Sequence, residues 1–190
     1  MSSDLAVALL WVAWLVSWQV AARRARKAVT RPPIEQERPY LLLIGFGAVL
    51  VLVSFRPFAS WVLFGIPAPA VQWVLVALAA LGFAFTWWAR IHLGVLWSGS
   101  VTRKPGHRVV DSGPYALVRH PIYSGSLVAL CSTALLRPGL VSFAGVGLFA
   151  VAFIIKARLE EEFLSVDLGA EYAAYRRRVP MLVPFWPPGR

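Results

Sequence analysis

The amino-acid sequence predicts an all-α integral membrane protein with about five transmembrane helices. Of its 190 residues, 58% are hydrophobic and only 15% are charged, which is more apolar surface than a soluble domain of this length can bury. The apolar residues gather in five runs, each near the length that crosses a bilayer. These runs are Leu5 to Ala22, Tyr40 to Phe55, Ala70 to Ala89, Ile122 to Leu136 and Leu140 to Ile155.

The flanks of these runs indicate how each helix begins and ends. The first run is followed, not preceded, by basic residues and has no small-residue cleavage site, so we expect a helix rather than a signal peptide. The segment Thr30 to Pro39 carries three prolines and is expected to be an extended connector. The fourth and fifth runs are short, and Arg137-Pro138-Gly139 is expected to form a tight turn between them.

The distribution of positive charge predicts the orientation. With the N-terminus outside, segments 23–39, 90–121 and 156–190 are cytoplasmic and hold all but two of the 19 Lys and Arg residues. This is the positive-inside pattern. The net charge of +10 is therefore interpreted as an orientation signal with attraction to anionic membrane lipids. We expect no nucleic-acid partner, and an active site that faces the cytoplasm.

Cysteine usage and simple motifs limit the chemistry. The single cysteine, Cys131, excludes an intrachain disulfide or a cysteine-based metal site, and we expect it to be a small core residue. Gly-rich phosphate motifs and the His-Glu-x-x-His pattern are missing from the sequence. We expect no metal.

The stretch 113–125 concentrates polar chemistry where a loop becomes the fourth helix. Pro121 suits the first position of a helix, which places His120 at or near the N-cap. A helix N-terminus favours an anionic group, and Arg119 would add a bidentate donor there. Arg119 as a snorkelling anchor and His120 as a boundary residue form the alternative. Both together, with two tyrosines nearby, favour a binding site.

A second polar segment follows the fifth run. If that helix continues past the membrane, Arg158 and Glu162 lie on one face at i, i+4 and can pair. The glutamates at 160–162 repel one another, so one or two are expected to meet cations elsewhere. A solvated amphipathic helix is the alternative.

Three blocks of the C-terminal half form a recognisable pattern: His107-x-Val109-Val110-x-Ser112-Gly113-x-Tyr115, then Arg119-His120-Pro121-x-Tyr123, then Arg158-x-x-Glu161-Glu162 with Gly169-x-Glu171-Tyr172-x-x-Tyr175 behind it. In order and spacing these blocks resemble the isoprenylcysteine carboxyl methyltransferase family. The resemblance covers about the last hundred residues. That family is similar in its core to the phospholipid N-methyltransferases.

The resemblance implies a membrane methyltransferase that uses S-adenosylmethionine, with N-terminal helices in 1–89 and a methyltransferase core in 90–190. By position, Arg158 and Glu162 would be catalytic, serving the acceptor and cofactor ends of the site. One family position departs, because a glutamine of the family falls at Ser100. The positions that would contact the cofactor are His107, Arg108, Val109, Val110, Tyr115, His120, Pro121, Ile122 and Tyr123.

Each charged group of such a cofactor has candidate partners. These are Tyr115 or Tyr123 for the sulfonium, Glu161 or Glu162 for the ammonium, and Arg119 or His120 for the carboxylate. An acceptor carboxylate is already nucleophilic at pH 7, so Arg158 would only orient it. An amine acceptor would need a base such as Glu162.

The resemblance implies carboxyl O-methylation of an isoprenylcysteine-like or other lipophilic acceptor. The acceptor would enter from the bilayer and the cofactor from the cytoplasm, in the inner or plasma membrane of a prokaryote. Three alternatives stay open: a phospholipid ethanolamine N-methyltransferase, an NADPH-dependent membrane reductase, and a non-enzymatic membrane scaffold.

Overall fold

The protein is a bundle of long helices in this computed structural model, which describes residues 1–23, 33–55, 65–97 and 109–187. The fold class expected from the sequence is confirmed. The helices are α1 (Ser3–Ala22), α2 (Ile34–Val53), α3 (Pro69–Leu93), α4 (Pro121–Leu136) and α5 (Leu140–Arg178), with short 3-10 turns η1 (Gly94–Leu96) and η2 (Gly113–Ala116).

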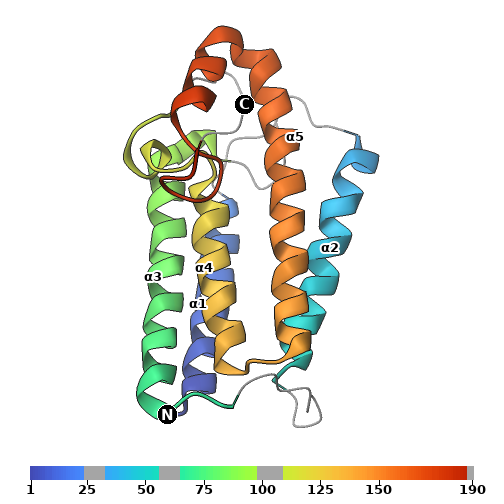
Figure 1. Cartoon of the computed structure of the whole chain (residues 1–190). Helices are drawn as coiled ribbons and strands as arrows, with labels where there is room; N and C mark the ends of the chain where they lie inside the picture. The colour runs from blue at the N-terminus through green and yellow to red at the C-terminus, as the bar shows by residue number, and fades with distance from the viewer. Residues whose placement is uncertain (24–32, 56–64, 98–108, 188–190) are drawn as a thin grey trace.

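Successive helices alternate in direction through the bundle (Figure 1). Four of them are long and apolar enough to cross a membrane, and α4, with 16 residues, is a shorter apolar helix. The ends of α1 and α3, the starts of α2 and α4, and the C-terminal part of α5 lie together at the upper end in Figure 1. We call this the polar end of the bundle. Its assignment to the cytoplasm is still a prediction.

Glycines allow the helices to pack in two close pairs. A Cβ atom added to Gly82 of α3 would lie 2.6 Å from the carbonyl oxygen of Gly125 in α4. A Cβ atom added to Gly47 of α2 would lie 2.9 Å from the carbonyl oxygen of Gly145 in α5. In a membrane, where lipid removes the hydrophobic drive between helices, such close backbone contact is a main source of association. It sets the register of α3 against α4 and of α2 against α5.

Helix α1 is attached to the α3–α4 pair by tryptophans. The Trp11 indole donates a hydrogen bond to Thr133 Oγ1 at 3.0 Å, and the Trp14 indole donates to Thr86 Oγ1 at 2.8 Å. Phe83 packs on both rings, edge to face on Trp11 and stacked on Trp14. Buried indole N–H groups therefore have acceptors although the helix is apolar almost throughout.

Three local expectations change. Helix α2 begins at Ile34, so the end of the expected extended connector is helical with Pro39 inside it. Near a helix start this proline removes one backbone hydrogen bond, and acidic residues in the first turn favour the helix there. Cys131 is exposed rather than in the core, because α4 turns the neighbouring residues inward. Helix α5 runs 39 residues and bends at Gly169, where φ is 54°.

We predict that Gly125→Ala destabilises the bundle, because the new methyl group meets the Gly82 carbonyl and the Thr86 side chain. The expected loss is about 1–3 kcal/mol of unfolding free energy, as for overpacking elsewhere. Gly147→Ala is the matched control, since a Cβ there meets nothing within 4 Å. Thermal unfolding in detergent should show a lower midpoint for Gly125→Ala alone, and equal midpoints would contradict the close α3–α4 contact.

Candidate active site

The start of α4 is joined to the C-terminal segment at the polar end. His120 is the N-cap of α4 and Pro121 its first residue, as the sequence predicts. The backbone N–H groups of Arg119 and His120 donate to the carbonyl oxygens of Pro180 and Met181, at 2.8 and 3.1 Å. Residues distant in sequence therefore form one wall at the point where α4 begins.

Arg119 is buried and fully engaged within the protein. Its Nε donates to Glu161 Oε1 at 2.7 Å, and its Nη1 donates to the carbonyl oxygens of Arg176 and Val179. Glu161 also forms an ion pair with Arg176, whose Nε lies 3.3 Å from Glu161 Oε2. The charge of the Arg119 guanidinium is thus compensated inside the protein. Its side chain links the start of α4 to Glu161 in α5 and to the carbonyl groups of Arg176 and Val179 at the C-terminal end of α5.

His120 lies between two carboxylates. Its Nε2 is 3.1 Å from Glu161 Oε1, and its Nδ1 is 3.4 Å from Glu160 Oε2. A hydrogen bond at one ring nitrogen and a carboxylate contact at the other favour the imidazolium, in which both nitrogens carry hydrogen. The cluster Arg119, His120, Glu160 and Glu161 thus holds two cations and two anions, and we call it the ion cluster.

The pKa shifts in the ion cluster agree with this assignment. Burial lowers the pKa of His120, but hydrogen bonds to Glu160 and Glu161 outweigh burial and leave that pKa above 6.5. Burial raises the pKa of both carboxyls, yet the His120 hydrogen bonds and nearby cations hold both below 4.5. All three groups lie beyond the apolar part of α5 or before α4, so they titrate outside the membrane span.

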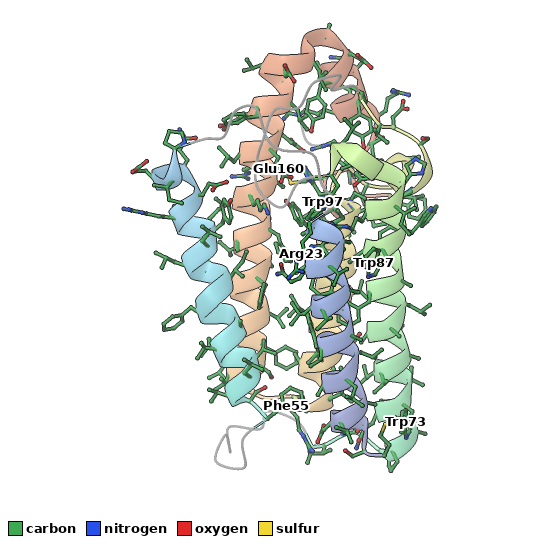
Figure 2. The ribbon with its side chains drawn as sticks, turned by 180° about the vertical axis from the view of Figure 1, so that it is seen from behind. Arg23, Phe55, Trp73, Trp87, Trp97 and Glu160 are labelled. Carbon is green, nitrogen blue, oxygen red and sulfur yellow. The ribbon has the colours of Figure 1, made fainter. Side chains whose placement is uncertain are left out.

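Tyr123 extends the cluster toward the bundle interior. Its hydroxyl donates to Glu160 Oε1 at 2.7 Å, and its ring stacks between those of His120 and Phe153 at centroid distances of 5.5 and 5.0 Å. Lys156 Nζ lies 5.6 Å from the same ring. Glu160 is labelled in Figure 2 at the polar end of the bundle.

A second group of aromatic residues holds the 3-10 turn η2 against the end of α3. His92 Nε2 lies 2.9 Å from Ser112 Oγ, and its ring stacks on Tyr115. The Tyr175 hydroxyl donates to the Tyr115 carbonyl at 2.7 Å. Gly113, at φ 58°, lets the backbone pass the His92 ring. The turn therefore joins α3 to the folded-back part of α5.

The structure brings together some of the sequence-predicted site residues and separates others. Arg119, His120, Tyr123 and Glu161 meet in or beside the ion cluster. Pro121 and Ile122 follow His120 in α4, and Tyr115 is buried in η2. Val109 packs on the cluster of Tyr172 and Tyr175, and Val110 is half-buried. His107, Arg108 and Ser100 lie outside the described residues.

The two predicted catalytic residues lie apart from the ion cluster. Arg158 and Glu162 are both exposed on α5, and the expected i, i+4 ion pair between them is not formed in the part of the chain that the structure describes. Glu161 turns inward instead and meets the cations that the glutamate run was expected to need. The catalytic role of Arg158 and Glu162 is therefore still a prediction.

Sequence reasoning missed Glu160, Lys156 and Arg90, all at the polar end. Glu160 belongs to the glutamate run, where the sequence offers no signal to choose among three neighbours. Lys156 marks the end of the apolar run, a position where a lysine is typical of an orientation signal. Arg90 is the first charge after the third apolar run, a position typical of an interfacial anchor, yet it is buried.

The ion cluster and its neighbours suit a cationic, zwitterionic ligand such as S-adenosylmethionine. Buried carboxylates attract an ammonium, and tyrosine faces attract a sulfonium. One oxygen of Glu37, near Tyr40 in α2, is buried without a hydrogen-bond partner in the described structure, so a further acceptor is present for a ligand donor. The residues present therefore fit such a group.

Comparison with known proteins gives the class. The model of the isoprenylcysteine carboxyl methyltransferase (ICMT) family matches residues 74–166. Methanethiol S-methyltransferase 2 of Bradyrhizobium diazoefficiens is 32% identical over 93% of this chain and 71% of its own length. Methanethiol S-methyltransferase of Mycobacterium tuberculosis is 30% identical over 82% of this chain and 66% of its own length. Protein-S-isoprenylcysteine O-methyltransferase B of Arabidopsis thaliana is 34% identical over 45% and 44%.

Fold and comparisons together define a membrane protein of a methyltransferase class. The chain belongs to the isoprenylcysteine carboxyl methyltransferase family, as the resemblance of its motifs predicts. It spans about two thirds of the length of the two S-methyltransferases named above.

We predict that Glu161→Gln strongly destabilises the protein, because it leaves the buried Arg119 guanidinium without its carboxylate. Breaking such a pair costs about 3–5 kcal/mol. Glu162→Gln, the adjacent and exposed control, should change the unfolding free energy by no more than about 0.5 kcal/mol. Thermal unfolding of both variants in detergent compares them, and equal effects would show that Glu161 is not the partner of Arg119.

Stability should also depend on pH in a defined way. The contribution of His120, whose pKa is raised, is fully present below its unfolded value of about 6.5 and is lost as pH rises through the folded value. The contributions of Glu160 and Glu161 are present above 4.5 and are lost as pH falls. Melting midpoints across pH 4–9 should therefore fall at both ends. His120→Gln should flatten the alkaline side, and an unchanged alkaline decline would contradict the imidazolium.

Proposed function

We propose that this chain transfers a methyl group from S-adenosylmethionine to the nucleophile of a lipophilic or small apolar acceptor. The observation that carries the proposal is the buried ion cluster at the start of α4. Ionisable groups are expensive beside a bilayer, and packing of an apolar bundle does not need them. Membership of a methyltransferase family gives this cluster a specific chemical purpose.

The proposed donor site lies around the ion cluster and η2. Glu160 offers a negative charge that suits an ammonium or a sulfonium, and the Tyr123 hydroxyl holds this carboxylate in place. His120, whose two ring nitrogens face Glu160 and Glu161, is the residue proposed to position these carboxylates, with Arg119 supporting Glu161. The other proposed donor-site residues are His107, Arg108, Val109, Val110, Tyr115, Pro121 and Ile122.

The chain's own work in such a reaction is alignment and exclusion of water. S-adenosylmethionine, when bound, supplies a methyl group that is already activated on a positive sulfur, so an anionic acceptor needs orientation rather than a base. Arg158 and Glu162 lie on the exposed side of α5, about one helical turn apart. We propose that Arg158 and Glu162 act on the parts of the cofactor and acceptor that lie along this exposed side of α5.

A thiol is the acceptor that we favour. The relatives named for methanethiol S-methylation match this chain over 82–93% of its length, which includes the N-terminal helices where acceptor choice is expected to lie. Carboxyl O-methylation is the second candidate, because the family model and the Arabidopsis relative support it over the C-terminal core.

Binding of the product S-adenosylhomocysteine tests the proposal. Calorimetric titration of the detergent-purified protein should give saturable heat. His120→Ala should weaken the affinity at least about tenfold, because it removes the hydrogen bond that positions the Glu161 carboxylate, and hydrogen bonds to charged groups contribute about 1.5–3 kcal/mol. Arg177→Leu removes one exposed positive charge and should leave the affinity unchanged. Absence of saturable heat in the wild type, or saturation by NADPH instead, would contradict methyl transfer.

A further inference from the structure

Two Lys or Arg side chains are buried in the described structure, and they differ in their partners. Arg119 is 5% exposed and Arg90 is 6% exposed. Arg119 has the Glu161 carboxylate and two carbonyl oxygens. Arg90 pairs with no described carboxylate, and its Nη1 is buried without a hydrogen-bond partner among the described residues. A buried, uncompensated guanidinium is costly, so it needs an explanation beyond packing.

Tryptophan rings surround the Arg90 guanidinium. Its Cζ lies 3.3 Å from the ring centroid of Trp97, 4.4 Å from that of Trp18 and 5.7 Å from that of Trp87. Contact with a ring face stabilises the charge by cation–π attraction. A ring face is not a carbonyl or carboxylate acceptor, and Nη1 has no hydrogen-bond partner among the described residues. The cage therefore holds a cation in position and leaves donors for another group.

The helix pairing places this cage beside the start of α4. Thr86 of α3 lies against Gly125 of α4, because a Cβ on Gly125 would be 2.9 Å from Thr86 Cγ2. The helices are antiparallel, so one turn further along α3, about 6 Å, Arg90 is level with Pro121. Figure 2 shows Trp87 and Trp97 at the same end of the bundle as Glu160. The cage and the ion cluster thus flank the first turn of α4.

We propose that Arg90, within the cage of Trp18, Trp87 and Trp97, binds the anionic nucleophile of the methyl acceptor. This inference rests on the proposed methyl transfer and deepens it by naming the acceptor's charge state. Aromatic walls suit the apolar body of the acceptor, and a cation that no described carboxylate pairs with suits a single negative charge on its reactive end. Thiolates and carboxylates share this chemistry. A neighbouring arginine favours the thiolate form of a thiol, whose proton passes to water before the sulfur takes the methyl group and S-adenosylhomocysteine leaves.

Binding of matched probes tests the proposal without any turnover. The probes are N-acetyl-S-hexylcysteine, its uncharged primary amide, and hexanethiol, each titrated into protein saturated with S-adenosylhomocysteine in a neutral detergent. The wild type should bind the acid, the thiol or both, with the acid preferred over the amide at least about tenfold if carboxylates are accepted. Arg90→Leu should abolish the acid preference and weaken thiol binding by a similar factor.

Controls separate this role from others. Arg90→Lys keeps the charge without the planar fork and should retain part of the affinity, which also guards against misfolding of Arg90→Leu. Arg177→Leu removes an exposed charge at the same end and should change nothing. Affinity for S-adenosylhomocysteine should stay within about twofold in every variant, because the cage is not the donor site.

Several results would overturn the proposal. Equal binding of all probes by the wild type and Arg90→Leu would make Arg90 a structural residue. Loss of S-adenosylhomocysteine binding in Arg90→Leu, with probe binding intact, would assign Arg90 to the donor. A wild type that binds no S-adenosylhomocysteine would instead contradict the proposed methyl transfer. In that case the same acid, amide and thiol titrations without it still decide whether Arg90 is an anion site.

Discussion

The pairing of Arg119 and His120 with the carboxylates of Glu160 and Glu161 is the interaction on which the site depends. It joins the start of α4 to the half of α5 beyond the apolar core, and the backbone N–H groups of Arg119 and His120 donate to the carbonyl oxygens of Pro180 and Met181. Since Arg119, His120 and Glu161 are buried and Glu160 is half-buried, each charge is stable only while its partners stay in place. The cluster therefore fixes where α4 begins and how the C-terminal turn folds back.

Helix packing determines what surrounds that cluster. Close backbone contact at Gly82 and Gly125 fixes the height of α3 against α4, and with it the position of Arg90 beside the start of α4. The result is a bundle end with two contrasting basic sites. Arg119 is neutralised and rigid, whereas Arg90 retains a charge that the described residues do not balance. This arrangement would suit a donor site at the ion cluster and an acceptor site at Arg90, on either side of the start of α4.

Much of the fold could be predicted from the sequence because its signals are local. Apolar run length gives the helices, Pro121 gives the start of α4, and Arg137-Pro138-Gly139 gives the turn before α5. The cations that meet the glutamate run were expected from the repulsion of like charges. These features need only neighbouring residues for their physical cause.

The rotation of each helix about its axis could not be predicted. Lipid and protein core are both apolar, so a membrane helix carries little periodic signal for its buried face. Successive residues differ by about 100° around a helix, and this decides that Glu161 turns inward while Glu162 faces out. The same ambiguity explains why Cys131 was expected in the core and why no signal in the sequence shows that Arg90 is buried.

A methyl-transfer assay with the purified protein in liposomes is the most direct test of the proposed donor and acceptor. S-adenosylmethionine labelled in its methyl group would be supplied with hexanethiol, with N-acetyl-S-hexylcysteine and with phosphatidylethanolamine, and the labelled products identified. We expect label in a base-stable thioether, or in a base-labile methyl ester if the carboxylate is preferred. Label only in the phospholipid amine, or no protein-dependent label at all, would contradict this expectation.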